Sequence, residues 1–420
     1  MGSICAKDKT NKIVIKSYAK PGNTPTPNVP PKTMNTYKYV GEEFQQEIEK
    51  NDPSYSQKQQ KWNQYYQRKY DLLNDVNYSA LLKRSPSIEQ LQQQTNEDDQ
   101  CKEPKLNSNK QFSKKLILQL AQQLGGPFKL TNQDIIDAYL LKEINNEDFK
   151  NILMDGAISK YRWNFWMAQV YRNQDYDPLL YQKLKNETPS QKVLEDITKD
   201  VNRTFPSHDH FKDNNQGQQQ LLSVLKALSI LNEDIGYVQG MNYIVGFSLI
   251  VSGGKEEEVF WLIHFINTNP LFFWWEIYRV NFNYTKALCQ VFLKNFYEQL
   301  PGLYQHFQDE GISEQQYIWQ WILTQFLYTF PIDNVIFFWD FILATDIFSI
   351  IRISIAFLKE YGFDLVNKDI GEISEYFTGF IKDQLQIDIP QIIEAAKKID
   401  VNMTDDQKQF FKNYKPQSST

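Results

Sequence analysis

From about residue 113 onward, apolar side chains recur at helical spacing and short polar turns interrupt them. An apolar run over 116–124 stops at Gly125-Gly126-Pro127, and similar runs and turns continue to about residue 400. Strand signals are scarce, because no Asn-Gly or Asp-Gly turn lies between alternating apolar residues. The pattern predicts an all-α fold, arranged as a single large multi-helix domain over 111–400.

Two of the predicted helices carry apolar residues on more than one side. They span 243–251 and 319–328, and all-round apolarity is typical of helices at the centre of a large helical domain. The longest apolar stretch, 335–358, contains two aspartates and one arginine, whereas a membrane span needs about 18 apolar residues with few charges. We therefore expect these stretches to be buried helices, and we predict no membrane span.

The first 40 residues have a composition that cannot build a core. They hold seven lysines and one acidic residue, and five prolines fall within 21–31. We expect a basic, Pro-containing, disordered tail over 1–40. Gly2 and Cys5 are candidate lipidation sites, although Ala6 stands where a myristoylation motif has Ser or Thr. Acylation together with the lysines would give peripheral contact with a membrane, and an ordinary disordered N-terminus is the alternative.

Residues 41–110 form a Gln/Asn-rich extension between this tail and the helical domain. Trp62, Tyr66 and Tyr70 recur at helical spacing within it, which predicts an amphipathic docking helix. Its apolar face would pack on the main domain or on a partner, and a linker would follow it. At the other end of the chain, we assign 401–420 to a C-terminal tail.

The composition and the missing motifs exclude several kinds of chemistry. The formal net charge is −6 at pH 7, which argues against nucleic-acid binding. Three cysteines and four histidines lack the spacing of a metal site, so we predict no metal. The sequence has no Walker A loop, no G-x-G-x-x-G after a strand and no G-x-S-x-G elbow. The chain therefore has no recognisable nucleotide site or hydrolase nucleophile of its own.

One segment stands out because charged and apolar residues share a helical face. Ile197, Asp200 and Arg203 are three residues apart. Pro206 disfavours helix at Phe205, so we expect Arg203 in the last turn, with its guanidinium held by Asp200 through two contacts. The spacing alone favours the simpler interpretation, an i,i+3 ion pair at a helix C-terminus. The alternative is an arginine that projects beyond the surface of the domain.

A second segment, 234–242, places two glycines around a Tyr-x-Gln sequence just before a very apolar helix. Gly236 and Gly240 allow the backbone to turn tightly or to lie close to another surface. We expect Gln239 at the N-terminus of that helix, with its side-chain amide projecting. Taken alone, the segment is a turn punctuated by glycines.

Arg203 and Gln239 lie 36 residues apart, and the two segments together resemble the TBC-domain Rab GTPase-activating proteins over about 150–365. The matching residues of the two central motifs are Ile197, Asp200, Arg203, Tyr237, Gln239, Gly240 and Asn242. The outer motifs match more weakly, because Ser159 replaces a proline and a glycine is missing after the Trp-Asp pair. Their matching residues are Arg162, Trp166, Trp339 and Asp340.

The resemblance implies a TBC-like domain that completes the active site of a Rab in trans. Arg203 would be an arginine finger, and Gln239 would be a glutamine finger that orients the attacking water. Asp200 and Tyr237 would orient the fingers, and the other matching residues would support the domain. An arginine finger in trans contributes on the order of 10³–10⁵ in rate. The chain would need no cofactor of its own, because the Rab carries GTP and Mg²⁺.

The same resemblance implies an intracellular role in vesicle trafficking with a Rab as the partner. The location would be cytoplasmic, or peripheral on endomembranes or the plasma membrane. The alternative function is a catalytically silent TBC-like scaffold or a docking protein that binds a small GTPase or another partner. A scaffold would bind the GTP-bound Rab and leave its rate of hydrolysis unchanged.

Overall fold

The computed structural model describes residues 40–51, 56–57, 153–154, 156–157, 162–163, 165–167, 170, 177–212, 216–379 and 387–415. The regular structure within these ranges is helical, with no strand among them, so the prediction of an all-α fold is confirmed. The α-helices are α1 (Gly41–Asn51), α9 (Pro178–Asn186), α10 (Gln191–Val201), α11 (Gln216–Leu231), α12 (Met241–Ser252), α13 (Glu256–Thr268), α14 (Trp274–Tyr278), α15 (Asn283–Gln299), α16 (Pro301–Asp309), α17 (Ile318–Thr324), α18 (Ile332–Ala344), α19 (Ser349–Tyr361), α20 (Ile370–Gly379), α21 (Ile389–Ala396) and α22 (Asp405–Asn413). Short 3₁₀ helices are η2 (Asp209–Phe211), η3 (Val280–Phe282), η4 (Glu314–Gln316) and η5 (Gly362–Leu365).

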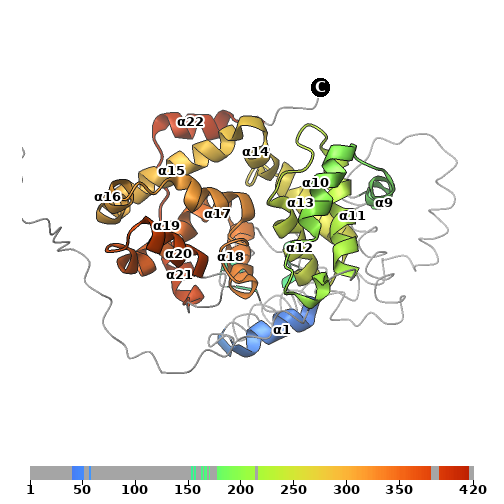
Figure 1. The fold of residues 1–420 in the computed structure, drawn as a ribbon, viewed down its shortest axis with the longest axis horizontal. Helices are drawn as coiled ribbons and strands as arrows, with labels where there is room; N and C mark the ends of the chain where they lie inside the picture. The colour runs from blue at the N-terminus through green and yellow to red at the C-terminus, as the bar shows by residue number, and fades with distance from the viewer. Residues whose placement is uncertain are drawn as a thin grey trace, which may run out of the picture.

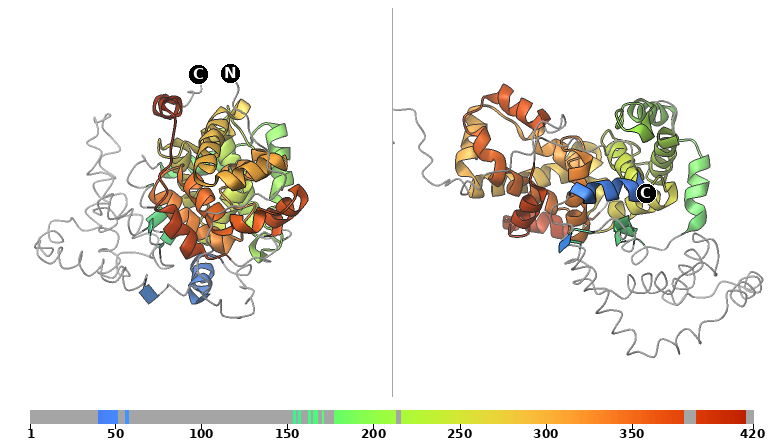
Figure 2. Two further views of the ribbon diagram at one scale, coloured as in Figure 1. Left: turned by 90° about the vertical axis from the view of Figure 1, so that its left-hand side faces the viewer. Right: turned by 90° about the horizontal axis from the view of Figure 1, so that it is seen from below.

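The helices gather into two sides that share one core. Helices α9 to α13 lie on one side, α15 to α21 lie on the other, and the short α14 lies between them (Figure 1). Helix α1 packs on α12, and the view from below shows it across the boundary between the two sides (Figure 2). The chain order therefore brings α10 and the start of α12 together on one side, where both central motifs lie.

Helix α12 is the most deeply enclosed helix of the first side. Eleven of its 12 residues are buried, as its all-round apolarity predicts. The other predicted all-apolar helix is shorter than expected, because α17 ends at Thr324 and both Gln325 and Phe326 have a left-handed backbone (φ 50° and 70°). Within the described residues, no helix combines the length and the apolarity needed to cross a membrane.

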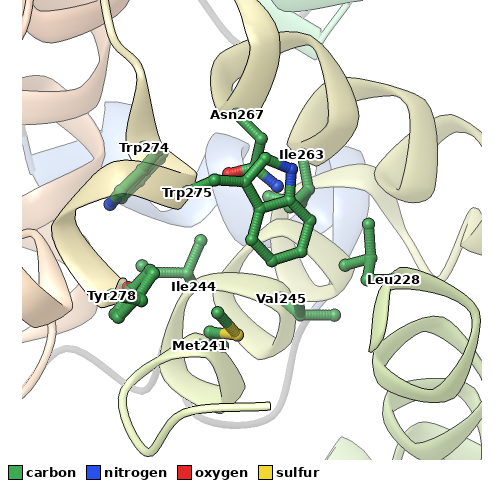
Figure 3. Close-up of a pocket in the computed structure, with 9 residues that line it drawn as sticks. All are labelled: Leu228, Met241, Ile244, Val245, Ile263, Asn267, Trp274, Trp275 and Tyr278. Atoms are coloured by element: carbon green, nitrogen blue, oxygen red, sulfur yellow. The ribbon is translucent and has the colours of Figure 1, made fainter. Parts of the chain in front are cut away.

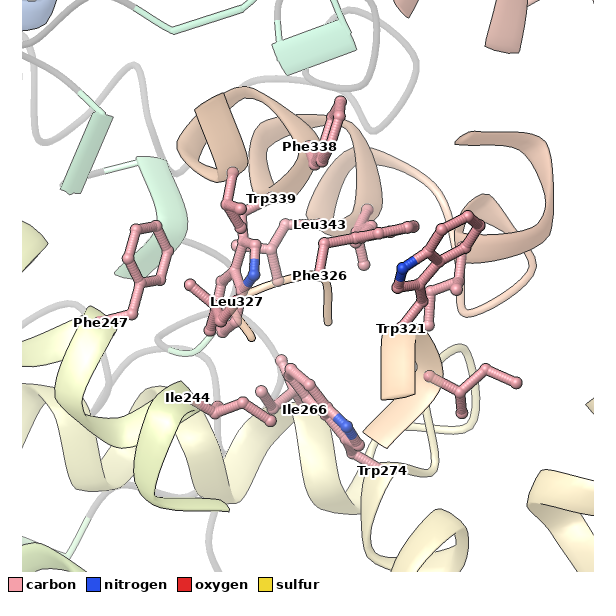
Figure 4. Close-up of a cluster of buried hydrophobic side chains, with 14 of the residues drawn as sticks. Ile244, Phe247, Ile266, Trp274, Trp321, Phe326, Leu327, Phe338, Trp339 and Leu343 are labelled. Atoms are coloured by element: carbon pink, nitrogen blue, oxygen red, sulfur yellow. The ribbon is translucent and has the colours of Figure 1, made fainter. Parts of the chain in front are cut away.

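Aromatic side chains fill the boundary between the two sides. Phe247 of α12 packs against Trp339 of α18 with ring centroids 5.2 Å apart, and Trp274 of α14 packs against the same indole at 5.4 Å. Figure 4 shows these rings between the helices of the two sides. Such rings bury large areas in favourable tilted and edge-to-face arrangements, so the two sides behave as one packed body.

A buried ion pair ties the segment before α9 to this boundary. Arg162 and Asp340 are both 1% exposed, with Nε 3.1 Å from Oδ2. The carboxylate also accepts hydrogen bonds from Trp166 Nε1 at 2.9 Å and from the backbone N–H of Ala157 at 3.0 Å. Burial raises the pKa of Asp340, and Arg162 opposes that change. The motif residues Arg162, Trp166, Trp339 and Asp340 therefore lie together in the core, away from solvent.

Both ends of the described chain carry helices that pack on this body. In the extension 41–110, α1 buries Phe44 and Ile48, and Gln45 Nε2 donates to the carbonyl of Val251 at 3.1 Å. This helix precedes the aromatic stripe that the sequence singles out, and Trp62, Tyr66 and Tyr70 lie outside the described residues.

The segment 401–420, assigned to a tail from its sequence, contains α22. Phe411 packs on Phe348 at 5.0 Å, and the hydroxyl of Tyr414 donates to Glu276 Oε2 at 2.5 Å. Glu276 is 2% exposed and also accepts two hydrogen bonds from Arg279, at 2.8 and 3.0 Å. Helix α22 is thus fastened to the residues around α14.

Candidate functional site

Arg203 lies directly after α10, at the surface. The helix ends at Val201 and Asn202 caps it. The side chain of Arg203 is 54% exposed, whereas that of Asp200 is 7% exposed. The pairing with Asp200 raises the pKa of Arg203 above its ordinary value, so the guanidinium keeps its charge while most of it faces solvent.

Helix α10 ends before Arg203, although the sequence predicts this arginine in the last turn of the helix. The hydroxyl of Thr204 donates to the carbonyl of Asp200 at 2.6 Å, and the backbone turns through i,i+3 hydrogen bonds at Arg203 and Thr204. Phe205, before Pro206, then adopts a left-handed conformation with φ 45°. This conformation costs a bulky residue about 1–3 kcal/mol, and the packing of Phe205 on Phe211 and Tyr243 offsets part of that cost.

A single carboxylate oxygen holds the guanidinium. Arg203 Nε lies 2.8 Å and Nη2 lies 2.6 Å from Asp200 Oδ1. The expected two contacts are therefore present, but both converge on one oxygen. The second oxygen, Oδ2, accepts the hydrogen bond that Tyr237 donates from its hydroxyl. Asp200 thus fixes the arginine and at the same time binds the second motif.

Tyr237 is a neutral phenol that anchors the turn before α12. Burial and the hydrogen bond to Asp200 raise its pKa well above the ordinary value, so the hydroxyl keeps its proton. Its oxygen also lies 3.2 Å from Asn242 Oδ1. A protonated hydroxyl next to a carboxylate is a donor, which gives this contact a fixed direction.

Asn242 closes the network between the two motifs. Its Oδ1 accepts a hydrogen bond from the backbone N–H of Gly240 at 3.0 Å, and its Nδ2 donates to Thr204 Oγ1 at 2.8 Å. Asn242 and Thr204 are both fully buried. Since buried polar groups without partners are costly, this closed set of hydrogen bonds fixes the turn after α10 against the turn before α12.

Gln239 lies on that second turn, just before α12 begins at Met241. Its side chain is exposed, and within the described part of the chain no hydrogen bond holds its amide. The next residue, Gly240, has φ 116°, which L side chains rarely adopt. A Cβ at Gly240 would lie 3.2 Å from the carbonyl oxygen of Leu323. The glycine therefore lets the turn lie directly on the end of α17.

Two features of this arrangement escape the sequence reasoning. Gly246 of α12 lies under the first motif, because a Cβ there would be 3.1 Å from both Phe205 and Thr204. Tyr243 packs edge-on against Phe205 and Tyr328, each with ring centroids 5.6 Å apart. The sequence signal that could have predicted the contact of Gly246 is a lone glycine inside a very apolar helix.

A small, mostly apolar cavity lies behind the turn that carries Gln239. It holds about 20 Å³ and lies between α12 and α14 (Figure 3). Its lining residues are Leu228, Met241, Ile244, Val245, Ile263, Asn267, Trp274, Trp275 and Tyr278. That volume suits about one water molecule. Within the described residues, no group of three or more His, Cys, Asp or Glu side chains could hold a metal ion.

The structure therefore separates the predicted residues into two sets. Ile197, Asp200, Arg203, Tyr237, Gln239, Gly240 and Asn242 lie at the junction of α10 and α12. Arg162, Trp166, Trp339 and Asp340 lie in the core, where Asp340 binds Arg162 and Trp166 and the ring of Trp166 packs on that of Trp339. The candidate lipidation residues Gly2 and Cys5 lie outside the described residues.

The part of the chain that carries this site matches a known family of domains in sequence. Residues 159–366 match the family model of the Rab-GTPase-TBC domain. This part of the chain belongs to the Rab-GTPase-TBC domain family. The match covers both motifs of the site and the buried residues that join the two sides of the fold.

Curated proteins are similar in sequence to about half of this chain. The chain is 31% identical to the Rab GTPase-activating protein eat-17 of Caenorhabditis elegans over 212 residues, which is 49% of this chain and 23% of that protein. It is 29% identical to the human Ecotropic viral integration site 5 protein homolog over 220 residues, 52% of this chain and 26% of that protein. The chain thus spans about a quarter of the length of these relatives.

Solved structures of TBC domains share the fold. The Chlamydomonas flagellar RabGAP TBC domain has a TM-score of 0.53 at 22% identity, covering 69% of this chain and 95% of that one. The Ypt/Rab-GAP domain of Gyp1p has a TM-score of 0.51 at 17% identity, covering 67% and 97%. At these identities the likeness establishes the fold of the TBC domain alone.

Proposed function

We propose that this TBC domain accelerates GTP hydrolysis by a Rab-family GTPase, with Arg203 and Gln239 entering the active site of the GTPase in trans. The observation that carries the proposal is the carboxylate of Asp200, which holds Arg203 through Oδ1 and Tyr237 through Oδ2. One charged group thereby sets the positions of an exposed arginine and of the turn that carries an exposed glutamine.

The two side chains suit the two needs of phosphoryl transfer. A water molecule attacks the γ-phosphorus, the bond to the bridging oxygen of GDP breaks, and charge spreads over the phosphoryl oxygens. The guanidinium of Arg203 is permanently charged and planar, so it can stabilise that charge through two hydrogen bonds. The neutral amide of Gln239 can accept from the water and donate to a phosphoryl oxygen. GTP and Mg²⁺ would belong to the GTPase.

Single-turnover hydrolysis by a panel of GTP-loaded Rab proteins tests this function. The wild-type chain should accelerate one or a few of them. Arg203→Ala should lower the stimulated rate by about 10³-fold or more, and Arg203→Lys should restore little of it because lysine lacks the planar fork. Gln239→Ala should also lose most of the stimulation.

Two control variants match the chemistry of the finger variants. Arg352→Ala removes another arginine that is paired with an aspartate, Asp346 at 2.8 Å, and Gln290→Ala removes an exposed glutamine on α15. Both should keep the wild-type rate. Full stimulation by Arg203→Ala would refute the finger role, and binding to a GTP-loaded Rab without acceleration would identify a silent scaffold.

The basic N-terminal segment adds a proposal about location. We propose that Gly2 and Cys5, together with the lysines of 1–40, bring the domain to a membrane surface. The chemistry is that of two acyl chains next to a basic stretch. Gly2→Ala and Cys5→Ser should each shift the protein out of the membrane fraction in cells, and unchanged fractionation of the double variant would contradict the proposal.

A further inference from the structure

We propose that an exposed apolar surface next to Arg203 and Gln239 selects which GTPase the domain acts on, an inference that rests on the proposed function. This surface, here called the aromatic rim, consists of Val280, Phe282, Trp319 and Tyr328. The first two come from η3, the third from α17 and the fourth from the turn after α17.

The aromatic rim has the character of a protein-binding surface. Val280 is 74% exposed and Tyr328 is 42% exposed. The rings of Phe282 and Trp319 pack on each other with centroids 5.5 Å apart and are half-buried. Adjoining exposed apolar side chains mark interaction sites, and tryptophan and tyrosine are enriched among the residues that carry binding energy.

The rim lies directly beside the turn that carries Gln239. That turn rests on the end of α17, where a Cβ at Gly240 would be 3.2 Å from the carbonyl oxygen of Leu323. Trp319 is one helical turn before Leu323 on α17. The same carbonyl oxygen accepts a hydrogen bond from Tyr278 at 2.5 Å, two residues before Val280. Tyr278, two residues before Val280, and the turn of Gln239 therefore meet at the same carbonyl group of α17.

The Tyr328 end of the rim reaches the first motif. The backbone N–H of Tyr328 donates to Thr324 Oγ1 at 3.3 Å, next to Leu323. Its ring packs on Tyr243, which in turn packs on Phe205. The rim thus runs past both motifs, and a protein that places a phosphate against Arg203 and a water against Gln239 must also cover it.

The η3 end of the rim has a strained backbone that neighbouring contacts keep in place. Asn281 and Phe282 have left-handed backbones with φ 70° and 51°, a conformation that costs on the order of 1–3 kcal/mol per residue. Arg279, just before Val280, is bound to buried Glu276 through two nitrogens. Backbone strain that a fold retains is typical of functional segments. Here the strained segment is the one that exposes Val280 to solvent.

The occupant of the rim is the GTPase itself, because the surface is continuous with the two fingers. The fingers meet GTP, water and phosphate, which are the same in every GTPase, so they cannot distinguish one Rab from another. A stable protein interface also buries about 1,200–2,000 Å² in total, more than two side chains can supply. The rim is the adjoining surface that meets residues in which GTPases differ.

Steady-state hydrolysis with varied concentrations of a stimulated Rab tests this proposal. Val280→Asp places a charge on a solvent-exposed side chain and should leave the fold intact. It should raise the KM for the Rab about ten-fold and keep kcat within two-fold. Leu179→Asp is the matched control, because Leu179 is 73% exposed on α9, and it should leave KM unchanged. Val280→Ala should give a smaller rise in KM than Val280→Asp.

Binding of the same variants to Rab proteins loaded with a non-hydrolysable GTP analogue separates failure of this proposal from failure of the proposed function. If the wild-type chain stimulates a Rab and Val280→Asp keeps the wild-type KM and affinity, the rim proposal is overturned and the proposed function stands. If no Rab is stimulated but one is bound with a Val280-dependent affinity, the rim proposal stands without catalysis. Absence of both stimulation and binding overturns both.

Discussion

The hydroxyl of Tyr237 donates to the carboxylate of Asp200, a residue 37 positions earlier in the chain. The other oxygen of that carboxylate holds Arg203. The positions of the exposed arginine and of the glutamine turn are therefore not independent, because a shift of Tyr237 displaces the group that orients the guanidinium.

Removing the hydroxyl of Tyr237 should weaken the orientation of Arg203. Hydrogen bonds to charged groups contribute about 1.5–3 kcal/mol, and each 1.36 kcal/mol changes a rate ten-fold. We therefore expect Tyr237→Phe to lower the stimulated kcat by about ten-fold with little change in KM. Tyr297→Phe, at an exposed tyrosine of α15, is the control. A wild-type kcat for Tyr237→Phe would show that Asp200 orients Arg203 without help.

Gly240→Ala should damage both stability and activity. The backbone at this position has φ 116°, and the added Cβ would press on the carbonyl oxygen of Leu323 at 3.2 Å. We expect a loss of about 1–3 kcal/mol in the free energy of unfolding and a lower stimulated rate, because the turn of Gln239 must move. Gly371→Ala in α20, where the backbone is helical, should keep both quantities near wild type. Chemical denaturation and single-turnover kinetics on both variants measure the contrast.

Asp340→Ala should destabilise the fold without changing the rate of stimulated hydrolysis by the protein that remains folded. The substitution leaves Arg162 buried and unpaired, which typically costs 3–5 kcal/mol. The kcat of the remaining folded protein should stay within two-fold of wild type. Asp346→Ala is the comparison, since its pair with Arg352 is more exposed, and it should cost less than about 1 kcal/mol. A specific loss of kcat in folded Asp340→Ala would place this residue in the catalytic machinery instead.

Acidification should destabilise the domain through His264. Burial lowers the pKa of this histidine to about 4, from about 6.5 in the unfolded chain. Between these values the unfolded chain binds more protons than the folded one, so stability falls as the pH drops from about 6.5 to 4. The loss amounts to at most about 3.4 kcal/mol at 1.36 kcal/mol for each pH unit.

Denaturation at pH 7 and pH 5 measures this loss, and His264→Phe should make the free energy of unfolding depend less on pH. Part of that dependence should remain, because burial also lowers the pKa of His210. The substitution keeps a ring stacked near Phe260, with which His264 now pairs at 6.3 Å. An unchanged pH profile in His264→Phe would show that other groups govern acid stability.

The sequence predicts the local parts of the site because they depend on short spacings. Asp200 and Arg203 must share a helical side at a separation of three residues, and the structure joins them as an ion pair. Gln239 follows from the glycine turn before an apolar helix, and its side chain is exposed there. Neither local pattern predicts that the two segments lie next to each other in space. Only the family resemblance implied that.

The remaining features depend on contacts between distant segments, which the periodicity does not encode. Helix α10 ends at Val201 because Thr204 and Phe205 pack against Gly246 of α12, 41 or more residues later. Helix α17 ends at Thr324 because Gln325 and Phe326 turn in the left-handed region within a buried aromatic cluster. The composition of 401–420 resembles a tail, yet Phe411 and Tyr414 find aromatic partners on the body.

The contact between α22 and Glu276 changes what counts as a minimal fragment of this protein. The family match ends at residue 366, but Tyr414, directly after α22, donates a hydrogen bond to the buried carboxylate of Glu276, which also restrains Arg279. A chain that keeps α20 and α21, with their buried side chains, but ends before Tyr414 would keep Arg203 and Gln239 and lose that bond. The segment next to Val280 would loosen while the turns of Arg203 and Gln239 kept their contacts, so under the proposed functions catalytic rate and choice of GTPase would respond separately to the length of the chain.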